Sequence, residues 1–240
     1  MREKKDWFPD GYWKEAAVQL RSTRMLIFAA LIVALRVAVK LFRIQIATGV
    51  SLTFDCYVNS MGSMVYGPVM ALLVGAVSDT LGCMIAPSGV YFFPFIFVEM
   101  SSSFLFALFF WHRKITVTST VFAKFTVNFI SNIVLTSLIM KWDYWFLYGT
   151  EKAYPLFNMV RIVKNLVLFP FEGILIVIVL HAIVPVFRRM RILPADQENI
   201  ELEKKHISLV ILLLLLSVAL ILFYIFFLRD FLKAHNITFF

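Results

Sequence analysis

ISLVILLLLLSVALILFYIFFL, residues 207–228, contains 22 residues and neither a charged side chain nor a proline. A helix of about 20 apolar residues crosses the roughly 30 Å hydrocarbon layer of a bilayer, so this run predicts a transmembrane helix. The whole chain has a similar character, because 61% of its 240 residues are hydrophobic and only 16% are charged. Ordinary soluble domains have about 25% charged residues. The sequence therefore predicts an all-α polytopic membrane protein.

Six further apolar runs precede this one, and we expect transmembrane spans at about 25–43, 50–66, 68–86, 92–111, 116–140 and 156–187. Polar residues interrupt the run at 50–66. Its first half is alternatively a loop that dips toward a cavity, because an irregular backbone at membrane depth is allowed only where protein or water lines it. The domains predicted from these spans are a leader at 1–22, a six-helix membrane domain at 23–187, a cytoplasmic linker at 188–206 and a seventh helix with an external tail at 207–240.

The 23 Lys and Arg residues give the chain a net charge of +8, and their distribution predicts its orientation. With the N-terminus inside the cell, thirteen of them lie in cytoplasmic segments and six in external segments. This bias predicts a cytoplasmic N-terminus and external loops at 40–56, 87–94 and 141–155. The charge suits an anionic lipid surface. No soluble segment carries a basic stripe interleaved with aromatic residues, so we exclude nucleic acid as a partner.

The sequence offers no pattern for a metal site or for catalysis. Its four His are scattered, Cys56 and Cys83 are the only cysteines, and no HExxH or CxxC spacing occurs. No signature of a nucleophile with its base is present either. We therefore expect no metal, no cofactor and no catalytic residues.

The segment RIVKNLVLFPFE, residues 161–172, places two cations and a carboxylate inside an apolar stretch. Arg161 and Lys164 are three residues apart, so they share one face of a helix. A charged side chain at bilayer depth costs at least about 2.5 to 3.5 kcal/mol, and it usually faces a partner, a cavity or a substrate. We expect an anion beside this pair, either a bound ligand or an internal carboxylate such as Asp79 or Glu99.

The carboxylates inside the predicted spans have two interpretations each. Asp79 either pairs with a cation or accepts hydrogen bonds from the N–H groups of a ligand. Its candidate ion-pair partners are the four cations inside spans: Arg36, Lys124, Arg161 and Lys164. Glu99 and Glu172 are ion-paired struts or, in a proton-coupled transporter, members of a proton relay.

Two further patterns concern surfaces. Ala30, Ala34 and Ala38 form a stripe of small residues on one helical face, which lets another helix approach closely. That helix belongs either to a partner or to the same bundle. The predicted external loops carry aromatic residues, which form an interfacial belt or roof a pocket and stack on a flat ligand. They are Tyr91, Phe92, Phe93, Trp142, Tyr144 and Trp145. Gly89 marks a sharp turn in the second of these loops.

The array GPVMALLVGAVSDTLGCMIAPSGVYFFP, residues 67–94, is followed about 65 residues later by RIVKNLVLFPFE. Together they resemble the folate-type substrate-binding component, or S component, of energy-coupling factor (ECF) vitamin transporters. The resemblance covers about 23–187. The chain departs from the family where a YFPGFT-like run is common, since residues 91–96 read YFFPFI. Ser101, Ser102 and Ser103 replace a later glycine-rich pattern, and the seventh span exceeds the usual six.

The resemblance implies a six-helix bundle in the cell membrane that captures its vitamin from outside with high affinity. It also implies partners: a transmembrane coupling subunit, which docks on the alanine stripe, and two ATPase subunits, which hydrolyse ATP and drive release by toppling the S component. The S component itself is not an enzyme. The external gate would come from residues 43–56 and 87–94.

For a folate, the resemblance implies roles for individual residues. Arg161 and Lys164 would neutralise the two carboxylates of the glutamate tail, and Asn165 adds an amide beside them. Asp79 would accept from the N–H groups of the pterin, while Tyr91 and Phe92 stack on its face near Gly89.

Three rival hypotheses remain open. The first is an S component for another vitamin, such as pantothenate or a thiamine precursor. The second is a membrane scaffold whose charges only pair internally, and the third is a membrane-embedded enzyme.

Overall fold

The computed structural model describes Phe8 and residues 10–47, 50–85, 92–149, 159–193 and 204–223, although some side chains within these ranges, including those of Arg161 and Lys164, are not described. In chain order the elements are α1 Tyr12–Val18, η1 Gln19–Arg21, α2 Thr23–Lys40, β1 Arg43–Ala47, β2 Val50–Thr53, α3 Asp55–Ile85, η2 Phe93–Phe95, α4 Ile96–Phe110, α5 Val117–Val127, η3 Asn128–Leu135, α6 Thr136–Tyr148, α7 Met159–Arg189 and α8 Lys204–Phe223.

Several of these helices are long and apolar enough to cross a bilayer. Within the described residues there are four such segments: Asp55–Ile85, Phe93–Phe110, Val117–Phe146 and Asn165–Arg189. A fifth results if residues 12–21 and α2, which meet at an angle of 82°, form one span. The predicted fold class, an all-α polytopic membrane protein, is confirmed by this arrangement. The predicted number of six helices plus one stays a prediction.

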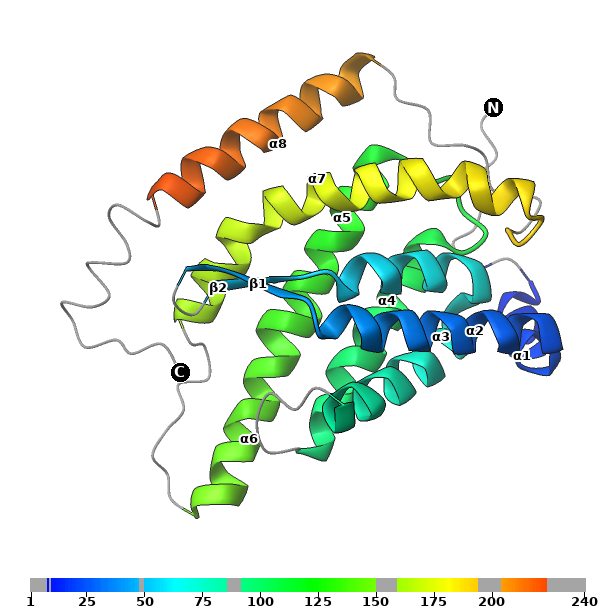
Figure 1. Cartoon of the computed structure of the whole chain (residues 1–240), viewed down its shortest axis with the longest axis horizontal. Coiled ribbons are helices and arrows are strands. Elements are labelled where there is room, and N and C mark those ends of the chain that lie inside the picture. The colour runs from blue at the N-terminus through cyan, green and yellow to red at the C-terminus, as the bar shows by residue number, and fades with distance from the viewer. Residues whose placement is uncertain are drawn as a thin grey trace.

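The chain reverses direction at Gly67, in the middle of α3. Gly67 adopts φ 76° and ψ 177°, a conformation that side chains other than glycine rarely adopt. Asp55 and Asp79 each lie twelve residues from Gly67, about 18 Å of helix. Yet they contact Arg36 and Lys40, one turn apart on α2, so both halves of α3 lie along α2 (Figure 1). These halves correspond to the predicted second and third spans.

The first of the predicted external loops contains two strands. β1 and β2 pair antiparallel, with Arg43 opposite Thr53, so the predicted span at 50–66 is wrong for its first residues, and its helix starts at Asp55. Alternating apolar residues in RIQIA, residues 43–47, are the pattern of a strand. The predicted loop at 141–155 is also wrong for its first part, because α6 continues to Tyr148 and ends at Gly149 with φ 59°.

The apolar core lies between the helices and fixes how closely they approach. Phe106 and Phe110 of α4, Val117 of α5 and Leu180 of α7 are fully buried in one cluster. Gly75 lets α3 and α4 meet, since a Cβ at this position would lie 2.9 Å from the backbone of Glu99 and Met100. α8 lies along the outside of α7 (Figure 1) and exposes large apolar side chains, among them Leu212, Leu215 and Phe223.

Candidate functional site: two buried polar clusters

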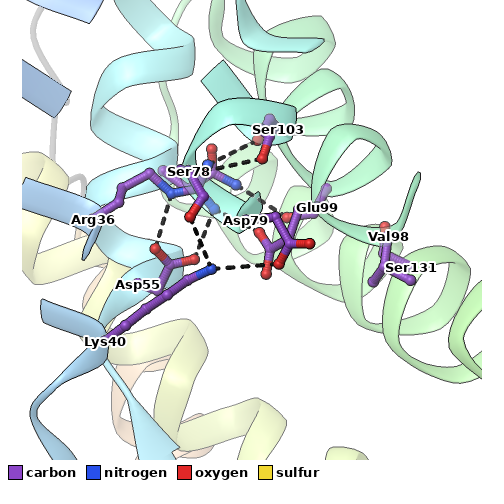
Figure 2. Close-up of polar contacts among 12 residues, drawn as sticks. Arg36, Lys40, Asp55, Ser78, Asp79, Val98, Glu99, Ser103 and Ser131 are labelled. Carbon is purple, nitrogen blue, oxygen red and sulfur yellow. Dashed lines mark hydrogen bonds and ion pairs between the residues drawn. The ribbon is translucent and has the colours of Figure 1, made fainter. Parts of the chain in front are cut away.

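The first polar cluster is organised by Arg36 of α2. Its Nε and Nη2 donate to the two carboxylate oxygens of Asp55 at 2.9 and 2.8 Å. Nη2 also donates to Glu99 Oε2 at 2.6 Å, and Nη1 to Ser103 Oγ at 3.2 Å. The side chain is 0% exposed. The planar guanidinium fork suits a bidentate carboxylate, so Arg36 ties α2 to the start of α3 and to α4 (Figure 2).

Lys40, one turn further along α2, continues this cluster. Its Nζ lies 3.6 Å from Asp79 Oδ1 and 3.5 Å from the carbonyl oxygen of Ser78, as Figure 2 shows. The side chains of Lys40 and Asp79 are 20% and 17% exposed. Lys40 is not among the predicted partners of Asp79, because the sequence analysis assigns residues 40–56 to an external loop. That assignment is wrong, because α2 extends through Lys40. We call Arg36, Lys40, Asp55, Asp79, Glu99 and Ser103 the Arg36 cluster.

The second polar cluster joins α5 to α7. Lys124 Nζ lies 2.9 Å from Glu172 Oε2, and Lys124 is buried. Asn128 Nδ2 donates to the same oxygen at 3.5 Å, and Asn132 Nδ2 donates to Asn128 Oδ1 at 3.0 Å. We call these four residues the Lys124 cluster. The interpretation of Glu172 as an ion-paired strut is confirmed, as it is for Glu99.

The two asparagines of the Lys124 cluster lie on η3, which is π-helical. Ser131 from the same segment shares a 2.6 Å hydrogen bond with Ser101 of α4, and Thr136 Oγ1 donates to the carbonyl oxygen of Ser131 at 2.8 Å. π-helical turns inside helices occur frequently at functional sites. Sequence reasoning missed this feature, although Lys124, Asn128 and Asn132 recur every four residues and so predict one polar face.

The predicted ligand-binding residues are only partly placed by the structure. Arg161 and Lys164 belong to α7, with side chains outside the described part, and Asn165 is half-buried. Gly89 and Tyr91 lie outside the described residues. Phe92 contacts Trp142 and Phe146, with ring centroids 5.9 and 6.0 Å apart. Aromatic residues of two predicted loops thus meet, between η2 and α6.

The predicted docking stripe lies on an open face of α2. Ala30, Ala34 and Ala38 are all exposed, while Ile32 and Arg36 are buried on the opposite side of the helix. Large apolar residues flank the stripe and are exposed as well: Ile27, Leu31 and Leu35. Within the described part of the molecule, no other helix of the same chain covers the three alanines.

Comparison with known protein families shows which family this chain belongs to. A family model described as the S component of ECF-type riboflavin transporters matches residues 20–189, which is more than half of the chain. The chain belongs to this family of ECF-type S components. The S component is thus a multi-pass membrane protein and a transporter subunit, and α8 lies beyond the matched region.

Two individual relatives are named as folate transporters, whereas the family model is named for riboflavin. The folate transporter FolT of Clostridium novyi is 26% identical over 157 residues, which cover 65% of this chain and 88% of that protein. FolT of Leuconostoc mesenteroides subsp. mesenteroides is 30% identical over 155 residues, covering 62% and 80%. The predicted resemblance to folate-type S components is confirmed by these matches.

A solved structure shares the fold. The crystal structure of FolT bound with folic acid superposes with a TM-score of 0.54 at 23% identity, over 64% of this chain and 90% of that one. At this level of identity the likeness establishes the fold of the S component. It therefore supports reading the helices of residues 20–189 as one S-component bundle with an additional C-terminal helix.

Proposed function

We propose that this S component captures a folate from outside the cell and delivers it to an ATP-driven ECF importer. The observation that carries this proposal is the match to two FolT proteins, one of them 30% identical over 80% of its own length. Folates combine a flat pterin, rich in N–H donors, with a glutamate tail that has two carboxylates. The proposed site must therefore hold a polar heterocycle at one end and two negative charges at the other.

The positive end of the site is proposed on the first turns of α7. Position 161 lies two helical turns before Leu168 and three before Glu172, and both of these residues are largely buried. On a regular helix, position 161 falls on the same face as these two residues. Arg161 and Lys164 supply two positive charges for the tail carboxylates, and Asn165 an amide.

The apolar wall of the site is proposed at the aromatic contacts of η2 and α6. Phe92 presents a ring held by Trp142 and Phe146, and Tyr91 and Gly89 precede it in the chain. A flat heterocycle gains dispersion and stacking energy against such rings, about 0.5 to 1.5 kcal/mol for a pair beyond the area that it buries. Phe92 and Tyr91 thus contribute affinity for the aromatic part of the ligand.

In this proposal, partner subunits supply the energy for transport. The exposed stripe of Ala30, Ala34 and Ala38 receives helices of a transmembrane coupling subunit, because small residues permit close approach of helices in lipid. Two ATPase subunits hydrolyse ATP. The N-terminus is cytoplasmic and the membrane is the cell membrane. This orientation is supported by exposed cations near the ends of α2 and α7, where Arg24 donates to the carbonyl oxygen of Met190.

A second candidate ligand is riboflavin, because the matching family model carries that name. Purified protein titrated separately with folic acid, 5-formyltetrahydrofolate and riboflavin distinguishes the two. We expect saturable binding of a folate with a Kd below about 1 µM, a binding free energy of about −8 kcal/mol or better, and no binding of riboflavin. Binding of riboflavin without either folate would overturn the proposal and support the second candidate. Adding pantothenate and thiamine to the panel covers the other vitamins.

A further inference from the structure

We propose that the surface where α2 begins and α7 ends binds the phosphate of an acidic phospholipid such as phosphatidylglycerol. The inference goes beyond the capture of a vitamin and does not depend on which vitamin is bound. Five arginines lie at this surface and all are exposed. We call them the arginine site; they are Arg21, Arg24, Arg188, Arg189 and Arg191.

Two contacts bring these arginines together from opposite ends of the matched region. Arg24 Nη2 donates to the carbonyl oxygen of Met190 at 2.9 Å. One turn further along α2, the ring of Phe28 packs edge-on against that of Phe187, with centroids 5.6 Å apart. The start of α2 and the end of α7 accordingly lie at the same end of the bundle (Figure 1). Cations that are far apart in the sequence therefore share one surface.

The backbone at the end of α7 holds an arginine where glycine is the usual residue. The N–H of Ile192 donates to the carbonyl oxygen of Phe187 at 3.1 Å, and the N–H of Arg191 donates to that of Arg188 at 3.0 Å. These two bonds define a Schellman motif, whose left-handed position is commonly occupied by glycine. Arg191 occupies it with φ 52°, although this conformation is unfavourable for a residue with a Cβ. The motif therefore fixes a positive charge at a place where backbone stability alone would favour glycine.

The charge of the arginine site is not balanced by the carboxylates that the structure describes. Within the described residues, no ion pair joins a carboxylate to four of its members: Arg21, Arg24, Arg189 and Arg191. Residues 196–203 carry four carboxylates and lie outside the described residues, so the experiment below must separate their effect from that of a lipid. Guanidinium groups bind phosphate oxygens through two parallel hydrogen bonds, and clustered cations attract anionic lipids. A phosphate is thus the anion that this site suits.

The position of the arginine site along the helices favours a lipid over a soluble phosphate. The membrane-length segment of α7 ends at Arg189, so the site lies where this helix leaves the hydrocarbon layer and the phosphates of lipids are found. Exposed apolar side chains lie within one or two turns of the arginines on both helices: Leu26, Val186 and Met190. Acyl chains can contact these side chains while the phosphate contacts the arginines. A soluble phosphate would use only the cations.

The test measures lipid binding to the full-length protein in detergent by native mass spectrometry. Phosphatidylglycerol and phosphatidylcholine with the same acyl chains are titrated separately, and we expect the wild-type protein to bind phosphatidylglycerol more tightly. Arg191→Gly should weaken phosphatidylglycerol binding by about fivefold, because one cation near the headgroup is lost. Its thermal transition without lipid should be unchanged or raised, since glycine suits the left-handed position. Arg191→Lys keeps the charge and should keep most of the affinity.

A double variant and a matched control distinguish the site from general charge. Arg24→Gln with Arg191→Gly should weaken phosphatidylglycerol by roughly 25-fold if the two contributions multiply. Lys14→Gln with Lys141→Gln removes two exposed cations outside the arginine site and should leave the affinity unchanged. An equal loss in this control would overturn the inference, because the protein would then respond only to its net charge.

Two further results would also overturn the inference. Equal affinity of the wild-type protein for the two lipids would mean that the arginines serve the carboxylates of residues 196–203 or an acidic protein partner. Displacement of phosphatidylglycerol by an equal concentration of inorganic phosphate would show that the site takes an adventitious ion only. Retention of phosphatidylglycerol under that competition, together with the loss in Arg191→Gly, supports a lipid site.

Discussion

The Arg36 and Lys124 clusters each contain a buried cation, but they differ in how many helices that cation joins. Arg36 gives four hydrogen bonds to three side chains from two neighbouring helices, and both oxygens of Asp55 are engaged. In the Lys124 cluster one oxygen of Glu172 takes both contacts and the other remains available among the described residues. Arg36 therefore joins three helices, α2, α3 and α4, whereas Lys124 joins two, α5 and α7. Both cations are buried, so the comparison teaches that the number of helices that a cation joins, rather than its burial alone, decides how much stability its loss should cost.

The largest expected effect is the loss of stability in Arg36→Met. This change leaves Asp55 and Glu99 without their cation inside the bundle, and breaking a buried pair typically costs about 3 to 5 kcal/mol. We expect a strongly lowered thermal transition in detergent, with ligand binding lost together with the fold. Arg36→Lys is the matched control, since it keeps the charge, loses the bidentate fork and should unfold at an intermediate temperature. An unchanged transition in Arg36→Met would mean that the cluster is not structural.

Lys124→Met should cost less stability than Arg36→Met. Glu172 is partly exposed and keeps its hydrogen bond from Asn128, so we expect a loss of about 1 to 3 kcal/mol. Thermal unfolding in detergent measures this loss beside that of Arg36→Met. If Lys124→Met destabilised the protein as much as Arg36→Met, the distinction between the clusters would fail.

The sequence predicts that the buried charges of these clusters are paired, but it does not predict every partner or the backbone geometry. Charges within apolar runs indicated that Glu99 and Glu172 pair with cations, because an isolated charge in lipid is too costly. The partner of Asp79 was missed because hydropathy cannot distinguish the last turn of a helix from a loop, and Lys40 lies in that turn. The π-helical path of η3 depends on backbone hydrogen bonds, which no residue pattern specifies. Strands β1 and β2 are not predicted although RIQIA alternates, because five residues are a weak signal beside the long apolar runs of the neighbouring helices.

Lys40→Met should have a small effect and thereby mark the edge of the Arg36 cluster. Its ion pair with Asp79 is long and partly exposed, and such pairs contribute about 0.2 to 1 kcal/mol. We expect a slight decrease in the unfolding temperature, clearly smaller than for Arg36→Lys. Asp79→Met in the same background should then add little, because the pair is already broken. A loss as large as that of Arg36→Met would place Lys40 in the structural network.

Ala34→Trp should change stability least of all, although Ala34 lies only two residues from Arg36. Arg36 is fully buried and Ala34 is exposed on the other face of α2, so the larger side chain meets no other described helix and should alter the unfolding free energy by less than about 0.5 kcal/mol. Folate binding by the purified protein should remain intact. Folate uptake in cells that also express the coupling subunit and the ATPases should be abolished, because the indole group fills the surface on which a partner helix would pack. Loss of binding and uptake together would instead mean that the stripe packs within the chain.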